Sequence, residues 1–377
     1  MTAPPATVAP GTSPVRAEAA AGQPGIGASI DREGPGPAAG GPHGSATTVF
    51  ERRAMGSPLR LALNGVTEAA AAAAWDAVSE EIERVEEACS RFRPTADLVR
   101  LNSTAGDPAG VLVDGRLARS LAAADRAFRH TAGRFDARVL GALEALGDVA
   151  ISPPPTDASR RTASPSVEPG RHSPSGVSQG QGWRPSGLRI DPRTSRVAVL
   201  RPVDLGGIAK GLALRWARRR ALETLVRLGM DVGRTSLLLE AGGDLVVHGP
   251  APQGGPWLIG VEHPGGDREP VAVAAITRGA ICTSSVRIRA WRDPDGRPAH
   301  HLIDPATGEP GGTGLLSVTV AADDPAWAEV RSKTLFLAGP RAIRDEARSL
   351  DLAAWWVDAG GELGMTPRAR QLTAWTR

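Results

Sequence analysis

A glycine-rich stretch at residues 203–211, which reads Val-Asp-Leu-Gly-Gly-Ile-Ala-Lys-Gly, stands directly before a long amphipathic run at residues 212–230. Paired glycines at a helix start let bare backbone approach a phosphate, and the first-turn N–H groups and the helix dipole favour its negative charge. An aspartate beside such a site is explained if a cation lies between the acid and the phosphate. The alternative is a tight strand-to-helix turn with a solvated lysine.

Composition narrows the class of protein. The 377 residues suggest one large or two ordinary domains, and an apolar fraction of 41% allows a sizeable core. The net charge is only +3, without an arginine-rich stripe interleaved with aromatics, so nucleic acid is not expected as a partner. Cys89 and Cys282 lie far apart without CxxC spacing, which predicts free thiols.

Targeting signals are not evident. No apolar run approaches the roughly 18 residues of a membrane span, and the first residues lack the basic start and apolar centre of a signal peptide. We therefore expect a cytoplasmic protein without a transmembrane segment. An extracytoplasmic location stays open if the true start codon lies further downstream.

Two low-complexity segments frame the predicted domain. Residues 1–46 are rich in Ala, Pro and Gly and predict a disordered tail, and residues 151–187 predict a disordered insertion within one domain at residues 47–377. Apolar spacing predicts helices at residues 67–90, 97–102, 117–130, 212–229, 327–337 and 341–350. It predicts strands at residues 49–63, 188–190, 197–200, 237–239, 245–247, 257–261, 271–276, 315–320, 353–357 and 361–365, the last two closing the chain as a hairpin. This mixture, with its hairpins, favours an α+β fold over a doubly wound sheet.

Three further stretches carry candidate chemistry. Glu-Ala-Gly-Gly-Asp at residues 240–244 is first of all a turn between strands. Thr283 and Ser284, with Arg289 beyond them, suit a phosphate grip but also describe an ordinary loop. His-His-Leu-Ile-Asp at residues 300–304 precedes a tight turn that can bring His301 to Asp304, as general base chemistry needs. The alternative there is an Asx turn with exposed histidines.

The order of these stretches is more specific than any one of them. Asp-Leu-Gly-Gly-Ile-Ala-Lys-Gly, Ala-Gly-Gly-Asp, Thr-Ser, His-His-Leu-Ile-Asp-Pro-x-Thr-Gly and Ser-Val-Thr-Val follow one another and resemble the ApbE family of flavin transferases. The resemblance runs from about residue 55 to residue 339, with the low-complexity stretch as an insertion. It implies a compact two-lobed α+β fold with mixed or antiparallel sheets and packed helices.

The resemblance also implies a site and a reaction. FAD would be bound between the lobes, and FMN would pass to a threonine hydroxyl of a partner redox protein with release of AMP, aided by Mg²⁺. Carried over by motif, the FAD contacts are Met55, Phe92, Arg134, Phe135, Asp136, Asp204, Lys210, Thr283 and Ser284. The residues near the reacting phosphates are His301 and Asp304, and the implied metal positions are Gly207, Glu329 and Lys333.

One position departs from the family pattern. Where the family has Asp, and Thr four residues later, this chain has Glu329 and Lys333. Glutamate can ligate Mg²⁺ through oxygen, but a protonated lysine cannot ligate a metal. Lys333 is expected either to pair with Glu329 one helical turn away or to replace the metal as a phosphate clamp. We therefore expect an Mg²⁺-dependent FAD:protein FMN transferase, with an FAD carrier or an FAD pyrophosphatase giving FMN and AMP as alternatives.

Overall fold

The computed structural model describes residues 47–148, 184–265, 269–287 and 289–377. The predicted tail lies outside these residues, and so does nearly all of the predicted insertion. Only its last residues are described, and there Ser186 donates a hydrogen bond to the buried Asp125 at 2.5 Å. None of the helices in the described ranges has the length and apolar character needed to cross a bilayer.

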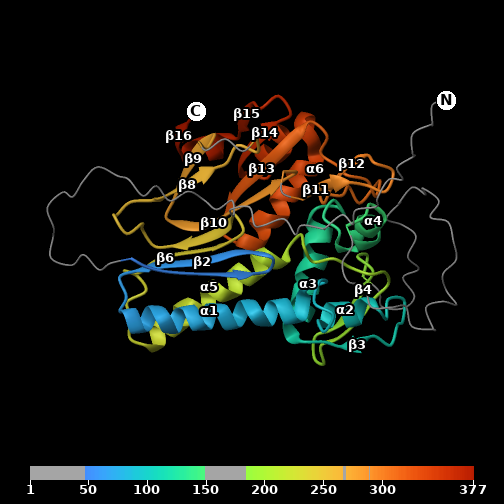
Figure 1. The fold of residues 1–377 in the computed structure, drawn as a ribbon, viewed down its shortest axis with the longest axis horizontal. Coiled ribbons are helices and arrows are strands. Elements are labelled where there is room, and N and C mark those ends of the chain that lie inside the picture. The colour runs from blue at the N-terminus through green and yellow to red at the C-terminus, as the bar shows by residue number, and fades with distance from the viewer. Residues whose placement is uncertain (1–46, 149–183, 266–268, 288) are drawn as a thin grey trace, which may run out of the picture.

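An eight-stranded antiparallel sheet organises the molecule (Figure 1). Its strands, in spatial order, are β1 (Thr48–Ala54), β2 (Ser57–Asn64), β6 (Ser236–Ala241), β7 (Asp244–His248), β10 (Arg278–Ser285), β13 (Leu315–Ala322), β14 (Ala353–Asp358) and β15 (Leu363–Met365). Strand β6 is buried along its whole length, because its alternate side chains enter different cores. Leu237 and Leu239 face one core and Leu238 the other, as the two-residue period of a strand requires.

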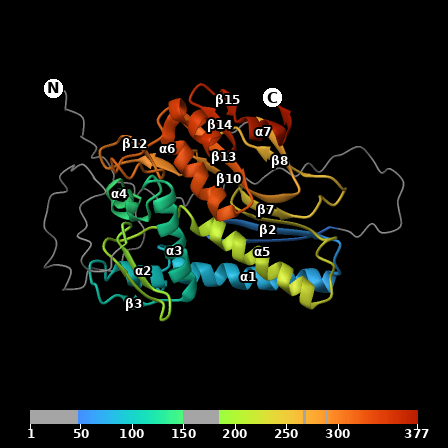
Figure 2. The same cartoon turned by 180° about the vertical axis from the view of Figure 1, so that it is seen from behind.

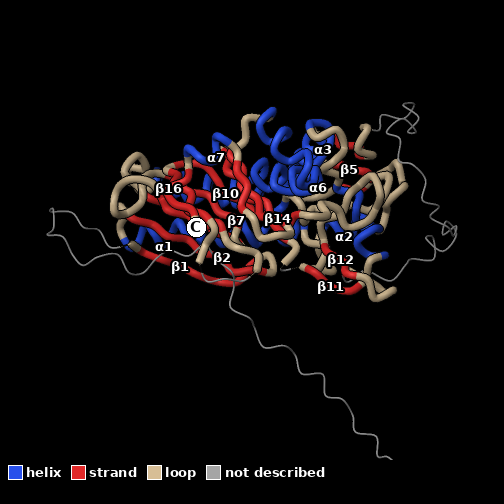
Figure 3. Tube along the Cα trace, turned by 90° about the horizontal axis from the view of Figure 1, so that it is seen from above, coloured by secondary structure: helices blue, strands red, loops and turns tan. Residues whose placement is uncertain are grey.

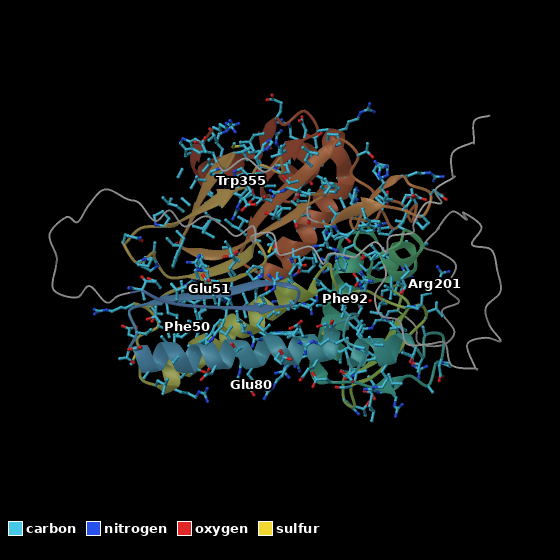
Figure 4. The ribbon with its side chains drawn as sticks, in the orientation of Figure 1. Phe50, Glu51, Glu80, Phe92, Arg201 and Trp355 are labelled. Carbon is cyan, nitrogen blue, oxygen red and sulfur yellow. The ribbon has the colours of Figure 1, made fainter. Side chains whose placement is uncertain are left out.

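Helices cover one face of this sheet. They are α1 (Glu68–Cys89), α5 (Ala209–Arg227) and α6 (Pro325–Ser349). Figure 2 shows α1 and α5 side by side beneath the sheet, with α6 rising from the start of α5. Phe50 on β1 lies between the sheet and α1, where its ring stacks on Trp75 with 5.5 Å between centroids (Figure 4).

The opposite face of the sheet packs on a three-stranded sheet of β8 (Trp257–Val261), β9 (Ala272–Ile276) and β16 (Thr373–Thr376), next to α7 (Pro367–Gln371). A helical region lies at the other end of the molecule (Figure 3). It contains α2 (Asp97–Asn102), α3 (Gly115–His130), a 3₁₀ turn at Ala137–Val139, α4 (Leu140–Ala145) and the small sheet of β3 (Val111–Leu112), β4 (Leu188–Asp191) and β5 (Arg196–Val199). The hairpin of β11 (Ala290–Arg292) and β12 (Pro298–His300) lies beside it.

The fold confirms the predicted α+β class and corrects several elements. The single strand expected at residues 49–63 is a hairpin, because Met55 and Gly56 both have positive φ and reverse the chain. The two helices expected at residues 327–337 and 341–350 are confirmed as the two parts of α6, which the non-helical Gly339 separates with a φ of 75°. The strand β10 was not expected, and α7 and β16 follow the hairpin that was expected to close the chain.

Candidate functional site

The glycine-rich stretch forms a loop that leads into α5 and is held from both sides. The side-chain amide of Asn102 accepts from the Val203 N–H and donates to the Val203 carbonyl, both at 2.9 Å. The Asp204 N–H donates to the Ala137 carbonyl at 2.7 Å, and Asp204 Oδ2 accepts from the Gly206 N–H at 3.1 Å. The loop therefore presents Gly206 and Gly207 in a defined position at the start of the helix.

A buried arginine ties this loop to residues that are distant in sequence. Arg91 Nε lies 3.1 Å from Asp204 Oδ1, and Arg91 Nη2 lies 2.7 Å from Asp148 Oδ2, which Arg289 also contacts at 2.5 Å. Burial raises the pKa of Asp204, against the opposing charges of Arg91 and Arg289. The Phe92 ring lies 4.4 Å from the Arg91 guanidinium, and Phe92 is 52% exposed, so an exposed aromatic side chain lies against the arginine that binds Asp204.

A cluster of buried charges lies where α5 meets α6. Lys210 Nζ lies 2.9 Å from Asp244 Oδ2 at the start of β7, and Lys333 Nζ lies 3.3 Å from Glu329 Oε1 within α6. The second carboxylate oxygen of Glu329 accepts from the Gly211 N–H at 2.8 Å. Burial alone would lower the pKa of Lys210, but the charges of Asp244 and Glu329 outweigh it and hold Lys210 protonated.

The two helices can approach this closely because residue 211 is glycine. A Cβ there would stand 2.5 Å from the Ala326 Cα, well inside van der Waals contact.

The hairpin turn at Met55 packs beside the turn between β6 and β7, where the Gly242 N–H donates to the Pro58 carbonyl at 3.0 Å. Met55 is thus in a turn, and its side chain packs on the edge of the main core.

A cleft opens between the Asp204 loop, the segment around the 3₁₀ turn, the loop that follows β12, and α6. It brings together seven of the predicted site residues: Arg134, Phe135, Asp136, Asp204, Gly207, His301 and Lys333. Arg289, Leu302 and Pro305 complete much of its wall. Arg134 is paired with Glu346, and Asp136 with Arg138. Cationic and backbone donors therefore line a space next to an imidazole.

His301 is held neutral in this cleft. Burial and the nearby charges of Arg289 and Lys333 lower the pKa of His301 well below its ordinary value. Its Nδ1 lies 3.4 Å from the Arg289 carbonyl oxygen, which can only accept. In the neutral ring this contact places the proton on Nδ1, and within the described part of the chain no hydrogen bond is made to the Nε2 lone pair.

Other predicted residues have structural partners outside the cleft wall. Ser284 Oγ lies 2.8 Å from Ser332 Oγ on α6, and Thr283 Oγ1 lies 2.9 Å from Thr319 Oγ1 on β13. Asp304 accepts from the Ala306 N–H at 2.9 Å in an Asx turn. Among the described residues no hydrogen bond joins His301 to Asp304, so the expected turn is present without the expected pair. The roles assigned to these residues stay predictions.

Sequence reasoning missed the residues that connect the cleft to its surroundings. Arg91 and Asp148 were not singled out, although Arg91 stands at the end of α1 beside Phe92. Arg289 was noted only as part of a loop. The local sequence does not reveal that Arg91 is buried and paired, because its partner Asp148 lies 57 positions further along the chain.

Comparisons with known proteins identify relatives of this chain. The FAD:protein FMN transferase of Klebsiella pneumoniae is 31% identical over 161 residues, which are 42% of this chain and 43% of that protein. The chain therefore matches less than half the length of this curated relative. The FAD:protein FMN transferase of Treponema pallidum is 27% identical over 279 residues, which are 71% and 72% of the two chains.

Solved structures match over more of the chain. The crystal structure of the ApbE protein of Thermotoga maritima has a TM-score of 0.69 at 26% identity and covers 87% of this chain and 99% of its own. The apo flavinyl transferase ApbE of Pseudomonas stutzeri has a TM-score of 0.63 at 21% identity, covers 88% and 98% of the two chains, and shows the shared fold. The ApbE family model matches residues 55–356. The chain belongs to the ApbE family.

Proposed function

We propose that this protein is an FAD:protein FMN transferase that moves FMN from FAD to a threonine hydroxyl of a partner redox protein and releases AMP. One observation carries the proposal: Lys333, Arg289 and the neutral His301 line the same cleft as the Gly206-Gly207 start of α5. Cations and backbone N–H groups suit the pyrophosphate of FAD, and an imidazole beside them suits proton removal from a hydroxyl. The family and the names of the relatives support the same activity.

The reaction needs one bond formed and one broken at phosphorus. The threonine Oγ forms a bond to the FMN phosphorus, and the bond from that phosphorus to the bridging oxygen breaks. AMP leaves with the bridging oxygen, and the hydroxyl proton leaves for a base. The protein's task is positioning and electrostatic stabilisation of charge on the phosphoryl oxygens.

His301 is the base we assign to that proton. Because Nδ1 faces the Arg289 carbonyl, Nε2 carries the lone pair that would accept the proton. The charges of Arg289 and Lys333 lower its pKa in the free protein, and a bound pyrophosphate would offset those charges. Binding of FAD would therefore make His301 a stronger base than it is without the substrate. Asp304 would act by holding the turn that follows, through the bond it accepts from Ala306.

Magnesium fits the implied ligand set poorly. Both oxygens of Glu329 already have partners, the Gly211 N–H at 2.8 Å and Lys333 Nζ at 3.3 Å. Lys333 offers only N–H donors. Within the described ranges no group of three or more His, Cys, Asp or Glu side chains is placed to hold a metal ion.

The test is to incubate the purified protein with FAD and a redox domain that carries an FMN-acceptor threonine, with and without Mg²⁺. Flavinylated acceptor and AMP in either condition support the transferase. FMN and AMP without labelling of the acceptor would instead indicate a pyrophosphatase. Bound but unaltered FAD would indicate a carrier. An acceptor with its threonine changed to valine controls for flavin attached elsewhere.

A further inference from the structure

Lysine is nearly absent from this chain. Of 44 lysine and arginine residues, 42 are arginine, and the two lysines are Lys210 and Lys333. Both ammonium groups lie at the junction of α5 and α6, each beside a buried carboxylate. A chain that otherwise uses arginine throughout has thus kept a compact, strongly hydrated point charge at one place only.

The two lysines differ in what surrounds them. Lys210 is paired with Asp244 at 2.9 Å and does not line the cleft. Lys333 lines the cleft, and its carbon chain lies against Gly207: a Cβ on residue 207 would meet the Lys333 Cδ at 3.4 Å and the Cε at 3.5 Å. The lysine stem therefore lies within ordinary van der Waals reach of the loop that leads into α5.

The Lys333 ammonium has donors to spare. An ammonium carries three N–H groups, and among the described residues its hydrogen-bond partner is the single oxygen Glu329 Oε1 at 3.3 Å. That distance is longer than the 2.9 Å of the Lys210 pair. The side chain is 17% exposed while Glu329 is 1% exposed, so the pair opens on the lysine side, toward the cleft.

We propose that the Lys333 ammonium binds the FAD pyrophosphate directly and takes the place of a divalent cation in this protein. The proposal rests on the transferase function proposed above. Lys333 contributes one positive charge and free N–H donors to the phosphoryl oxygens, and Arg289 lines the same cleft. Charge that develops on the AMP phosphate as its bond to the FMN phosphorus breaks is then stabilised by a fixed ammonium. Glu329 positions that ammonium from one helical turn away, through the contact of Lys333 Nζ with Glu329 Oε1 at 3.3 Å.

The scarcity of lysine allows a direct test by nuclear magnetic resonance. Protein labelled with ¹⁵N at lysine Nζ has two side-chain signals, and Lys333→Met, which keeps the stem length and removes the charge, identifies one of them. In EDTA, added FAD is expected to shift the Lys333 signal. Lys333→Met is expected to weaken FAD binding in EDTA by about tenfold or more, the loss of a charge-assisted hydrogen bond. Arg348→Met removes a cation from an exposed position of the same helix and serves as the matched control.

Metal binding gives the second readout. Without FAD, the parent protein is expected to leave the electron paramagnetic resonance spectrum of added Mn²⁺ unchanged, and flavin transfer by the parent is expected to persist in EDTA. Lys333→Thr is expected to bind Mn²⁺ and to require Mg²⁺ for transfer. Stoichiometric Mn²⁺ binding by the parent, complete loss of transfer in EDTA, or unchanged FAD affinity in Lys333→Met would overturn the proposal.

These outcomes separate the inference from the function on which it rests. Transfer that occurs only with Mg²⁺ leaves the transferase intact and rejects the role of Lys333. A Lys333 signal that FAD shifts, with no flavinylated acceptor under any condition, supports Lys333 as the pyrophosphate ligand and rejects the transferase. Lys333→Arg adds a conservative check, because the larger planar guanidinium is expected to restore only part of the FAD affinity in the space beside Gly207.

Discussion

The Gly211 N–H donates a hydrogen bond of 2.8 Å to Glu329 Oε2, across 118 positions in sequence. This bond joins the glycine-led start of α5 to α6 in the interior of the protein, since Glu329 is 1% exposed. The other oxygen of the same carboxylate faces Lys333. One side chain thus satisfies a backbone donor at a helix start and positions a cation at the cleft.

Glu329 is therefore expected to matter for stability as well as for binding. Glu329→Ala leaves the Gly211 N–H and the Lys333 ammonium without their partner, and we expect a loss of about 3 kcal/mol in the free energy of unfolding. Glu329→Gln keeps an oxygen acceptor for Gly211 and should lose clearly less. Urea unfolding of both variants at neutral pH measures the difference, and equal stability of Glu329→Ala and the parent would refute this role.

His301 and His300 form a matched pair of neighbours with different environments. The His301 ring lines the cleft, whereas the His300 ring packs edge-on against Phe336 with 6.0 Å between centroids. His301→Ala is expected to lower the turnover rate by about 10²-fold or more, the usual cost of losing a general base, and to leave FAD affinity largely unchanged. His300→Ala should keep the parent's turnover rate. Single-turnover transfer kinetics decide the point, and a rate drop of equal size in both variants would count against His301 as the base.

Two substitutions at Asp304 distinguish a structural from a chemical contribution of this residue to flavin transfer. Asparagine in its place can still accept the hydrogen bond from the Ala306 N–H, whereas alanine cannot. If Asp304 acts by holding this turn, transfer by Asp304→Asn stays within a few-fold of the parent and transfer by Asp304→Ala is abolished. Should both variants lose transfer equally, the negative charge itself is required.

Asp125 is expected to make stability depend on pH. Burial alone raises its pKa, but the hydrogen bonds from Ser186 and Arg184 and the charges of Arg184 and Arg129 outweigh that effect and hold the pKa below 3.8. A lowered folded-state pKa contributes stability above the unfolded value of 3.8 and loses it as the pH falls through the folded value.

We therefore expect Asp125→Asn to destabilise the protein at pH 7 by about 2–3 kcal/mol, because Arg184 loses its buried partner. The difference in the free energy of unfolding between the variant and the parent should shrink below about pH 4. Denaturant unfolding from pH 7 to pH 3 follows both quantities, and a gap that widens on acidification would reverse the assigned sign.

The sequence predicted long periodic elements well and short or non-local ones poorly. Helix α1 begins one residue after its expected start, because the Thr67 side chain accepts from the Ala70 N–H as a helix cap and Val78, Ile82 and Val85 mark one face. Strands β16 and β10 carry no comparable signal in the sequence. Strand β16 is only four residues long, and β10 is fixed by its pairing with β7 and β13. Gly339 was expected to end a helix, and its non-helical backbone does separate the two parts of α6.

The candidate site was predictable as motifs and not as a network. The stretches that hold Asp204, Lys210 and His301 stand out in the sequence, because glycines and clustered polar residues interrupt the apolar pattern. The ion pairs between them did not follow, because Lys210 meets Asp244 only through the return of β6 into β7, and Arg91 meets Asp204 only through the packing of α1 and α2 beside the loop. Such pairs depend on tertiary topology, which local spacing does not encode.

The most direct test of the central claim is mass spectrometry of the acceptor domain together with measurement of AMP after incubation with the protein and FAD. We predict an acceptor heavier by one FMN less one water, attached through the threonine oxygen, and AMP equimolar with the attached flavin. Release of AMP with free FMN and an unmodified acceptor, or FAD that stays whole, would contradict it.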